Sequence, residues 1–307
     1  MITRRVAGID CGTNSIRLLI ADVGEDGRLR DVLRRMEVVR LGEGVDRTGR
    51  LSEAALERTR VALAGYTAEI REHAVESVRM VATSASRDAA NAADFTAMVE
   101  ATLGRAPEVI TGDEEARLSF TGAVATLPAH AGQRLLIDIG GGSTEFVRGT
   151  GALVAAAISV DVGCVRMTER HLRSDPPRPE EIDAAVADVT GVAGGELAVA
   201  DPDRAATELV AVAGTATTIA GIALGLPAYD PEAIDGTRLT YEQVAKTTAD
   251  LAAADHAARL AIPVMHPGRA DVIVGGALVL RTVMERSGID AVLISEHDIL
   301  DGIALSA

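Results

Sequence analysis

Residues 135–147 read LLIDIGGGSTEFV, and residues 8–23 read GIDCGTNSIRLLIADV. In both stretches an apolar run ends in Asp, a turn with Gly and Ser follows, and a second apolar run begins. The matching positions are Asp10, Gly12 and Ser15 in one copy and Asp138, Gly140 and Ser143 in the other. The spacing between the copies is too long for a solenoid repeat, so it indicates a duplicated domain.

Strand and helix patterns alternate along the chain, which predicts the α/β class. Strands are predicted at 6–10, 15–23, 29–41, 78–83, 109–110, 135–139, 145–148, 153–160, 209–213 and 291–295. Helices are predicted from the cap Ser52 to about residue 70, and at 87–103, 113–127, 165–171, 179–199, 215–224, 268–286 and 298–305. The 307 residues predict two domains. The boundary is expected where Pro128 and Gly132 interrupt the pattern, giving domains 1–127 and 128–307, with a last helix at about 297–307 that can pack back on the first domain.

Composition excludes several classes of protein. Asp and Glu number 45 against 30 Lys and Arg, and a net charge of −15 disfavours non-specific nucleic-acid binding. Cys11 and Cys164 form no CxxC pattern, and the His residues show no metal-ligand spacing. No apolar run is long enough to span a membrane, so we expect a reduced, cytoplasmic protein. Aromatic residues make up 2%, which predicts an aliphatic core.

The repeated turns have the composition of a phosphate site. Gly permits a close backbone approach, successive N–H groups form an anion nest, and hydroxyl groups add donors. An Asp at the end of the strand would repel phosphate unless a cation lay between them, and Mg²⁺ typically combines one or two carboxylates with phosphate and water. Neither a P-loop nor a GxGxxG motif is present.

The chain resembles the exopolyphosphatase and guanosine pentaphosphate phosphohydrolase (Ppx/GppA) family of the actin–sugar kinase–Hsp70 superfamily. The matching stretches, in the family's order, are the two quoted above together with VATSASRDAAN, VITGDEEARLSFTGA, VGCVRMTERHL, VAVAGTATTIAGI and RADVIVGGALVL. The resemblance implies two actin-like (ribonuclease H-like) domains with a phosphate-binding cleft between them.

The resemblance also implies roles for individual residues. Glu115 matches the catalytic glutamate, and Asp138 and Glu145 match an acidic pair near Mg²⁺ or Mn²⁺. The phosphate-binding positions are Asp10, Gly12, Asn14, Ser15, Arg87, Gly140, Gly141, Gly142, Ser143, Thr144, Gly214 and Thr215. In the repeat Glu145 aligns with Arg17, as expected if only one half holds the metal.

Two of these assignments have a structural alternative. Thr111 and Glu114 read as a helix capping box, so Glu114 is expected to be structural. Glu115 then points elsewhere, which favours it as the general base. Arg87 could reach the site or lie on an exposed helix face. A basic stretch within residues 28–50 could guide longer substrate chains or form a solvated strand face.

The expected activity is hydrolysis of the terminal phosphate of inorganic polyphosphate. Longer family members carry further C-terminal helical domains, so we expect a preference for short chains here. Alternatives are guanosine pentaphosphate hydrolysis, a non-catalytic polyphosphate or alarmone sensor, and a sugar or acetate kinase. The three acids Glu115, Asp138 and Glu145 favour an enzyme over a sensor. The resemblance also implies a homodimer.

Overall fold

A computed structural model of the chain describes residues 2–307. It divides into two compact units, one of residues 1–125 with 298–307 and the other of residues 126–297. The chain therefore passes between the units twice. None of the helices formed by residues 2–307 has the length and apolar character needed to cross a bilayer.

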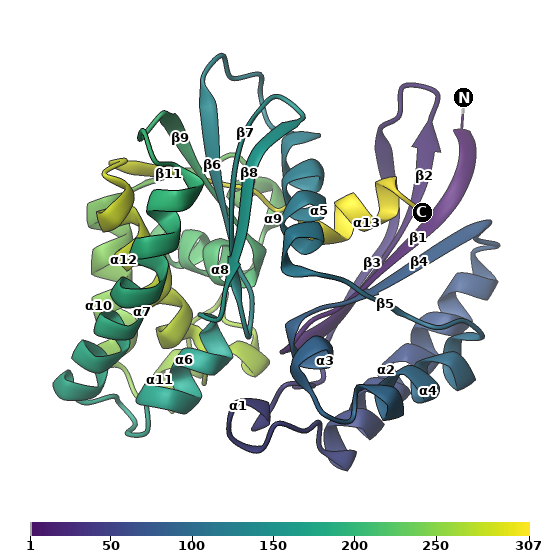
Figure 1. The fold of residues 1–307 in the computed structure, drawn as a ribbon, viewed down its shortest axis with the longest axis horizontal. Helices are drawn as coiled ribbons and strands as arrows, with labels where there is room; N and C mark the ends of the chain where they lie inside the picture. The colour runs from purple at the N-terminus through teal and green to yellow at the C-terminus, as the bar shows by residue number, and fades with distance from the viewer. Residues whose placement is uncertain (1) are drawn as a thin grey trace. The chain divides into compact units, whose positions relative to one another are not determined.

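The first unit holds a five-stranded sheet in the order β3-β2-β1-β4-β5 (Figure 1). Its strands are β1 (Ile2–Cys11), β2 (Ser15–Gly24), β3 (Leu29–Val38), β4 (Ser77–Ala82) and β5 (Glu108–Val109). Its helices are α1 (Val45–Thr48), α2 (Glu53–Glu72), α3 (Ser84–Asp88), α4 (Ala92–Leu103), α5 (Gly112–Val124) and α13 (Ile299–Leu305). β1, β2 and β3 are antiparallel neighbours, whereas β4 runs parallel to β1.

The second unit repeats this order as β8-β7-β6-β9-β11 and adds β10 at the edge. Its strands are β6 (Gln133–Ile139), β7 (Thr144–Thr150), β8 (Leu153–Val160), β9 (Ala206–Val212), β10 (Arg238–Thr240) and β11 (Ala291–Ile294). Its helices are α6 (Cys164–His171), α7 (Pro179–Ala200), α8 (Ala213–Ala223), α9 (Pro231–Ile234), α10 (Tyr241–Ala253), α11 (His256–Leu260) and α12 (Ile273–Ser287). The equivalent order confirms the predicted duplicated, actin-like α/β fold.

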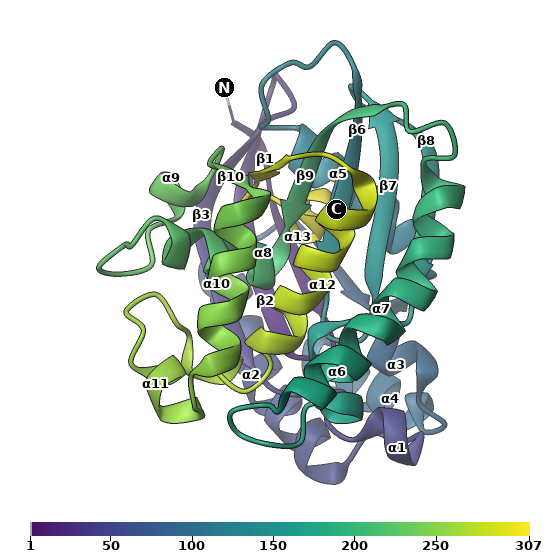
Figure 2. The same ribbon diagram turned by 90° about the vertical axis from the view of Figure 1, so that its left-hand side faces the viewer.

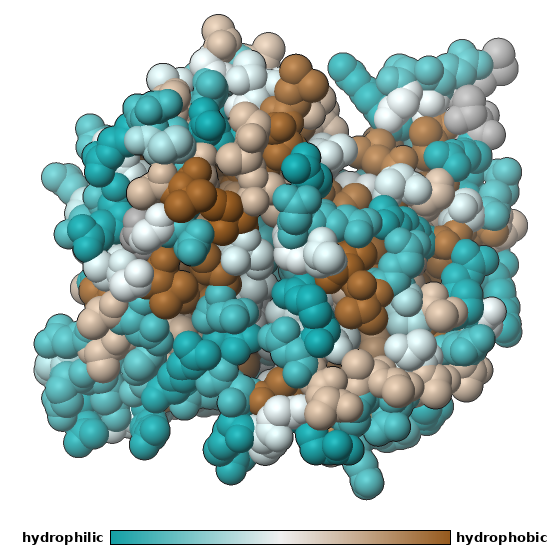
Figure 3. All heavy atoms as spheres, viewed as in Figure 1, coloured by the Kyte–Doolittle hydropathy of each residue, from teal (hydrophilic) through white to brown (hydrophobic). Residues whose placement is uncertain are grey.

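Each sheet is covered by helices. In the first unit α2 and α4 bury apolar residues such as Leu63 and Phe95 on one face, and α13 packs Leu300 and Ala304 against the other. In the second unit α7, α12 and α10 lie side by side (Figure 2). The cores are mainly aliphatic as predicted, although Phe95, Phe120 and Phe146 are fully buried in them. Hydrophilic residues cover much of the surface in Figure 3.

Several local predictions need correction. The helix predicted at 87–103 is two helices, because the chain turns out of α3 after Asp88 and re-enters α4 at Ala92. Between them the amide of Asn91 donates to the Leu51 carbonyl at 3.1 Å and accepts from its N–H at 2.9 Å. The helix predicted from residue 268 begins at Ile273, after a short 3₁₀ turn.

Candidate functional site

The first glycine turn joins β1 to β2. The N–H of Gly12 donates to the Ser15 carbonyl at 3.0 Å, which closes the turn. The carbonyl oxygens of Thr13 and Asn14 accept from N–H groups of residues 39–42 at 2.8–3.1 Å. Because successive N–H and C=O groups of a trans peptide point in opposite directions, the N–H of Asn14 faces away from that segment.

The second glycine turn joins β6 to β7 and is closed in the same way, by Gly140 N–H and the Ser143 carbonyl at 3.0 Å. The carbonyls of residues 140, 141 and 142 all accept from residues 164–166 at the start of α6, at 2.7–3.1 Å. The N–H groups of residues 141, 142 and 143 consequently point away from α6. Three successive N–H groups on one side of a turn form an anion nest.

The third predicted loop follows β9, which lies beside β6 in parallel register. Ala213 begins α8 with φ of 67°, a left-handed conformation that is strained for alanine. Gly214 is held against the guanidinium of Arg269, since a Cβ added to Gly214 would lie 2.4 Å from its central carbon. Arg269 Nη1 also donates to Thr218 Oγ1 at 3.2 Å. The loop thus places a cation beside Gly214 and Thr215.

Asp138 and Glu145 face each other directly across the β6–β7 pair. They are 5% and 1% exposed, and Ser159 Oγ donates to Glu145 Oε1 at 2.7 Å from the next strand. Like charges directly opposite one another destabilise a sheet. Two buried carboxylates in this arrangement suit a hard divalent cation that neutralises them.

No group of three or more His, Cys, Asp and Glu side chains within residues 2–307 is arranged to hold a metal ion. A cation at Asp138 and Glu145 would therefore complete its coordination with water and substrate oxygens. That is the usual mode of Mg²⁺, which binds through one or two carboxylates and keeps several waters. The residues present fit this cation.

The equivalent position in the first unit is neutralised by protein groups alone. Asp10 faces Arg17 across the β1–β2 pair, and Arg17 Nη2 lies 2.7 Å from Asp10 Oδ2. Arg17 Nη1 also contacts Asp298 Oδ2 at 2.5 Å. Burial lowers the pKa of Arg17, but Asp298 and Asp10 together raise it well above its ordinary value. The two turns thus share a backbone and differ in charge, in agreement with the predicted asymmetry.

Glu115 and Arg87 lie together in the first unit. Arg87 Nη1 contacts Glu115 Oε2 at 3.4 Å and donates to the Ile110 carbonyl at 2.9 Å. Glu115 is 7% exposed in the first turn of α5, whereas Glu114 pairs with Arg79 at 2.8 Å on the surface. Thr111 caps α5 by accepting from Glu114 N–H, but the Glu114 carboxylate does not complete a capping box.

The register of the sheets brings the predicted residues of each unit together. In the first unit β1 and β4 are parallel neighbours, so the first glycine turn adjoins residues 83–87, and Thr13 Oγ1 lies 2.9 Å from Ser84 Oγ. In the second unit β6 and β9 bring the second turn beside Gly214. Each unit therefore assembles its own half of the predicted set.

Sequence reasoning did not single out Arg269 as a site residue. It lies 55 positions from Gly214 in a stretch noted only for its resemblance, and no spacing rule relates the two. The cysteines are both free and buried, and burial raises the pKa of Cys164 to about 11, which suits a structural role.

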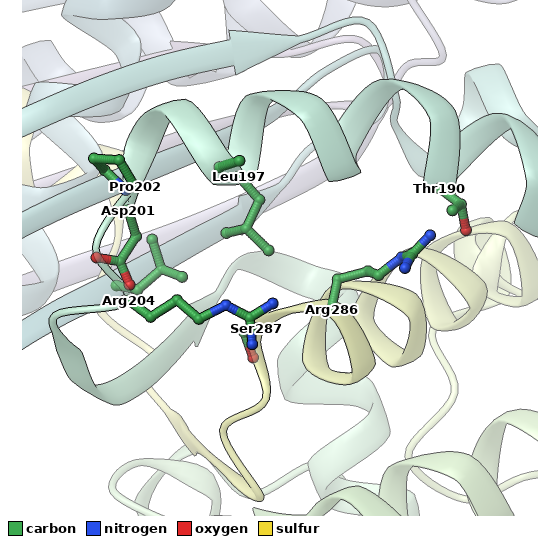
Figure 4. A pocket seen from close by; sticks show the side chains of 9 residues that line it. Thr190, Leu197, Asp201, Pro202, Arg204, Arg286 and Ser287 are labelled. Atoms are coloured by element: carbon green, nitrogen blue, oxygen red, sulfur yellow. The ribbon is translucent and has the colours of Figure 1, made fainter.

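A separate pocket of about 260 Å³ lies near the start of β6, away from the glycine turn that follows the end of this strand. Figure 4 shows Arg204 and Arg286 lining it opposite Leu197. The Asp201 carboxylate, at the Arg204 end of the pocket, accepts from the N–H groups of residues 205 and 206. None of the predicted site residues lines this pocket.

Comparison with known proteins gives consistent matches. The profile of the Ppx/GppA phosphatase family matches residues 19–307. Exopolyphosphatase 2 of Mycobacterium tuberculosis is 48% identical over 318 aligned positions, covering 100% of this chain and 99% of the relative. The structure of an exopolyphosphatase-like protein is 43% identical with a TM-score of 0.93, covering 99% of this chain and 97% of the other. The Aquifex aeolicus member of the Ppx/GppA family is 34% identical with a TM-score of 0.82 and the same coverage.

Proposed function

This chain belongs to the Ppx/GppA phosphatase family, and we propose that it is an exopolyphosphatase that hydrolyses the terminal phosphoanhydride of inorganic polyphosphate. The observation that carries the proposal is the pair of glycine turns, which have the same backbone but differ in the charged side chains beside them. One turn adjoins Arg17, and the other adjoins the buried carboxylates of Asp138 and Glu145. An anion nest of backbone N–H groups next to a cation site recognises phosphate rather than a neutral ligand.

The turns supply the binding groups. N–H groups of residues 141–143 and of Asn14, with the hydroxyl groups of Ser15 and Ser143, bind phosphate oxygens. The predicted role of the Thr144 hydroxyl needs correction, because it donates its proton to the Val162 carbonyl at 2.5 Å. Gly214 and Thr215 extend this surface in the second unit, where Arg269 adds a fixed positive charge. Asp138 and Glu145 would hold Mg²⁺ or Mn²⁺, which would neutralise negative charge on the phosphate oxygens.

Glu115 acts as the general base. Its carboxylate accepts a proton from the water that attacks the terminal phosphorus, while the bond from that phosphorus to the bridging oxygen breaks. The released oxygen stays on the shortened chain, and the terminal group leaves as inorganic phosphate. Arg87 holds the Glu115 carboxylate through its 3.4 Å contact. In this proposal Arg87 also contacts the transferred group.

The test compares Glu115→Gln with Glu114→Gln, because the two residues are neighbours on α5 and only Glu115 is buried. With short-chain polyphosphate and Mg²⁺, we expect phosphate release to fall by about 10²–10⁴-fold in Glu115→Gln. Glu114→Gln should stay near the wild-type rate, since the Glu114 side chain is 46% exposed and pairs with Arg79. Equal rates in both variants would show that the base is another residue.

Two further outcomes separate the alternative functions. Guanosine pentaphosphate carries the same kind of terminal phosphoanhydride, so it should be assayed beside polyphosphate with the same variants. If the wild type binds polyphosphate but releases no phosphate from either compound, the protein is a sensor. A homodimer stays a prediction, for which sedimentation velocity is the direct measurement.

A further inference from the structure

We propose that residues 40–50 form a track for the distal phosphates of a polyphosphate chain, with Arg47 and Arg50 as its contacts. The inference rests on the proposed polyphosphatase function and adds a determinant of chain length. The exposed side chains of Arg47 and Arg50 carry the positive charge of this segment.

One end of the segment is fixed to the first glycine turn. Gly42 N–H donates to the Thr13 carbonyl at 2.8 Å, and Arg40 N–H donates to the Asn14 carbonyl at 2.8 Å. A Cβ at Gly42 would lie 2.3 Å from the Thr13 methyl group and 3.2 Å from Cβ of Ala85. Only glycine allows the segment to lie this close to the turn.

The other end is fixed just beyond Arg87. Ala90 N–H donates to the Gly49 carbonyl at 2.9 Å, and Asn91 bonds both main-chain groups of Leu51. The segment therefore spans from the phosphate turn to the region of Arg87 and Glu115. When the terminal phosphate of a polyphosphate molecule lies at the first glycine turn, its next phosphates are within reach of this segment.

The segment is also rigid where the two arginines leave it. Thr48 Oγ1 donates to the Gly44 carbonyl at 2.9 Å and accepts from Arg50 N–H at 3.2 Å. Gly44 and Gly49 bracket α1 with φ of 73° and 66°, conformations that favour glycine. The backbone from which Arg47 and Arg50 extend is thereby fixed.

The charges of the segment favour an anion. The carboxylate of Glu43 is paired with Arg58 at 2.9 Å, whereas the side chains of Arg47 and Arg50 form no ion pair or hydrogen bond with the rest of residues 2–307. Asp46 directly precedes Arg47 in the sequence and carries the opposing charge. The protein has a net charge of −15, so the two guanidinium groups of this segment make the charge near the first glycine turn locally positive.

The same basic stretch provides a matched control. Arg28 and Arg30 are also exposed, but they lie at the far end of β3. Ten residues of strand span about 30 Å, so these two arginines are remote from the turn. Both pairs contribute equally to net charge, and only Arg47 and Arg50 adjoin the proposed track.

The experiment measures KM for tripolyphosphate and for long-chain polyphosphate in wild type, Arg47→Gln/Arg50→Gln and Arg28→Gln/Arg30→Gln. We expect the ratio of long-chain to tripolyphosphate KM to rise about threefold or more in the first double variant and to stay unchanged in the control. The salt dependence of long-chain KM should weaken in the same variant, because fewer counterions are exchanged with the chain.

Three results would overturn the inference. The first is an unchanged ratio of long-chain to tripolyphosphate KM in Arg47→Gln/Arg50→Gln. The second is the same rise of this ratio in the control variant, and the third is an equal rise of KM for both polyphosphates. Equilibrium dialysis with the same two polyphosphates keeps the test independent of hydrolysis. If wild type releases no phosphate but the first double variant selectively loses long-chain binding, the proposed function fails and the track stands.

Discussion

At the scale of single residues, Arg17 is the group on which the first glycine turn depends for charge balance. It lies between two buried carboxylates, Asp10 and Asp298, at 2.7 and 2.5 Å. Arg17→Met would leave both carboxylates buried without this partner, which typically destabilises a protein by about 3–5 kcal/mol. Arg35→Met is the control, because Arg35 is exposed and makes long contacts, with Glu69 at 3.5 Å and with the Arg34 carbonyl at 3.5 Å. Its effect should be within ~1 kcal/mol by urea unfolding.

The loss of folding stability in Arg17→Met should also depend on pH. Burial raises the pKa of Asp10, and Arg17 opposes this in the wild type. Without Arg17 the folded carboxyl binds a proton more readily than the unfolded one, so the stability of the variant falls as pH rises. The difference in the free energy of unfolding between Arg17→Met and wild type should therefore be largest near neutral pH and become smaller in acid. A difference that is independent of pH would mean that packing, rather than charge, is what Arg17 contributes.

The positions of most candidate residues could be predicted because they lie within contiguous motifs. Asp138 and Glu145 flank one turn, so their meeting across β6 and β7 follows from a simple hairpin. Arg269 could not be found this way, because its contact with Gly214 depends on how α8 and the segment before α12 pack. The roles of these residues stay predictions until they are measured.

At the scale of elements, the contact between α5 and α13 depends on two glycines. A Cβ at Gly122 would lie 1.9 Å from the Asp298 carbonyl, and one at Gly302 would lie 2.0 Å from the Leu118 carbonyl. Gly122→Ala or Gly302→Ala should force the helices apart and cost about 1–3 kcal/mol, as overpacking does. Phosphate release should fall too, because α5 carries Glu115.

Gly65 supplies the control for these substitutions. It lies inside α2, and nothing is found within 4 Å of a Cβ added there. Gly65→Ala should stabilise the protein by about 0.5–1 kcal/mol, since alanine is the better helix former. Thermal unfolding followed by circular dichroism measures all three variants. If Gly122→Ala and Gly302→Ala stabilise as Gly65→Ala does, the close helix contact is not required.

Elements with clear capping or alternation were predicted best. Ser52 caps α2 as expected, and β8 has the predicted bounds. No element was predicted between residues 225 and 267, although Thr240 and Gln243 form a capping box at the start of α10. The break between α3 and α4 depends on the distant contact from Asn91 to Leu51, which periodicity cannot reveal.

At the scale of the whole molecule, the duplication was visible in the sequence because both copies kept the Asp-Gly-Ser turn. The strand order follows from it, since each copy builds the same antiparallel group before a parallel strand. What the second unit adds, including β10 and the helices around it, has no counterpart in the first. The internal repeat therefore could not predict it.

The return of the chain to the first unit predicts that this unit is not stable without the last ten residues. α13 buries Ile299, Leu300 and Ile303 in the first unit, and Asp298 pairs with Arg17. Three aliphatic side chains at about 1.5–3 kcal/mol each approach the typical total stability of a domain, about 5–15 kcal/mol.

In a chain that ends at His297, the first unit should consequently no longer fold as a stable, cooperative unit. In a chain that ends at Leu305 it should still do so. The control removes the hydrogen bonds of Ser306 and Ala307 with Arg79 and Arg4 and the partly buried packing of Ala307, but it keeps α13. Amide hydrogen exchange resolves the outcome by region, because β1 and β2 should lose protection and β6 and β9 should retain it. Protection of β1 and β2 in the shorter chain would show that residues 2–125 fold without α13, and that the return of the chain to the first unit has another role.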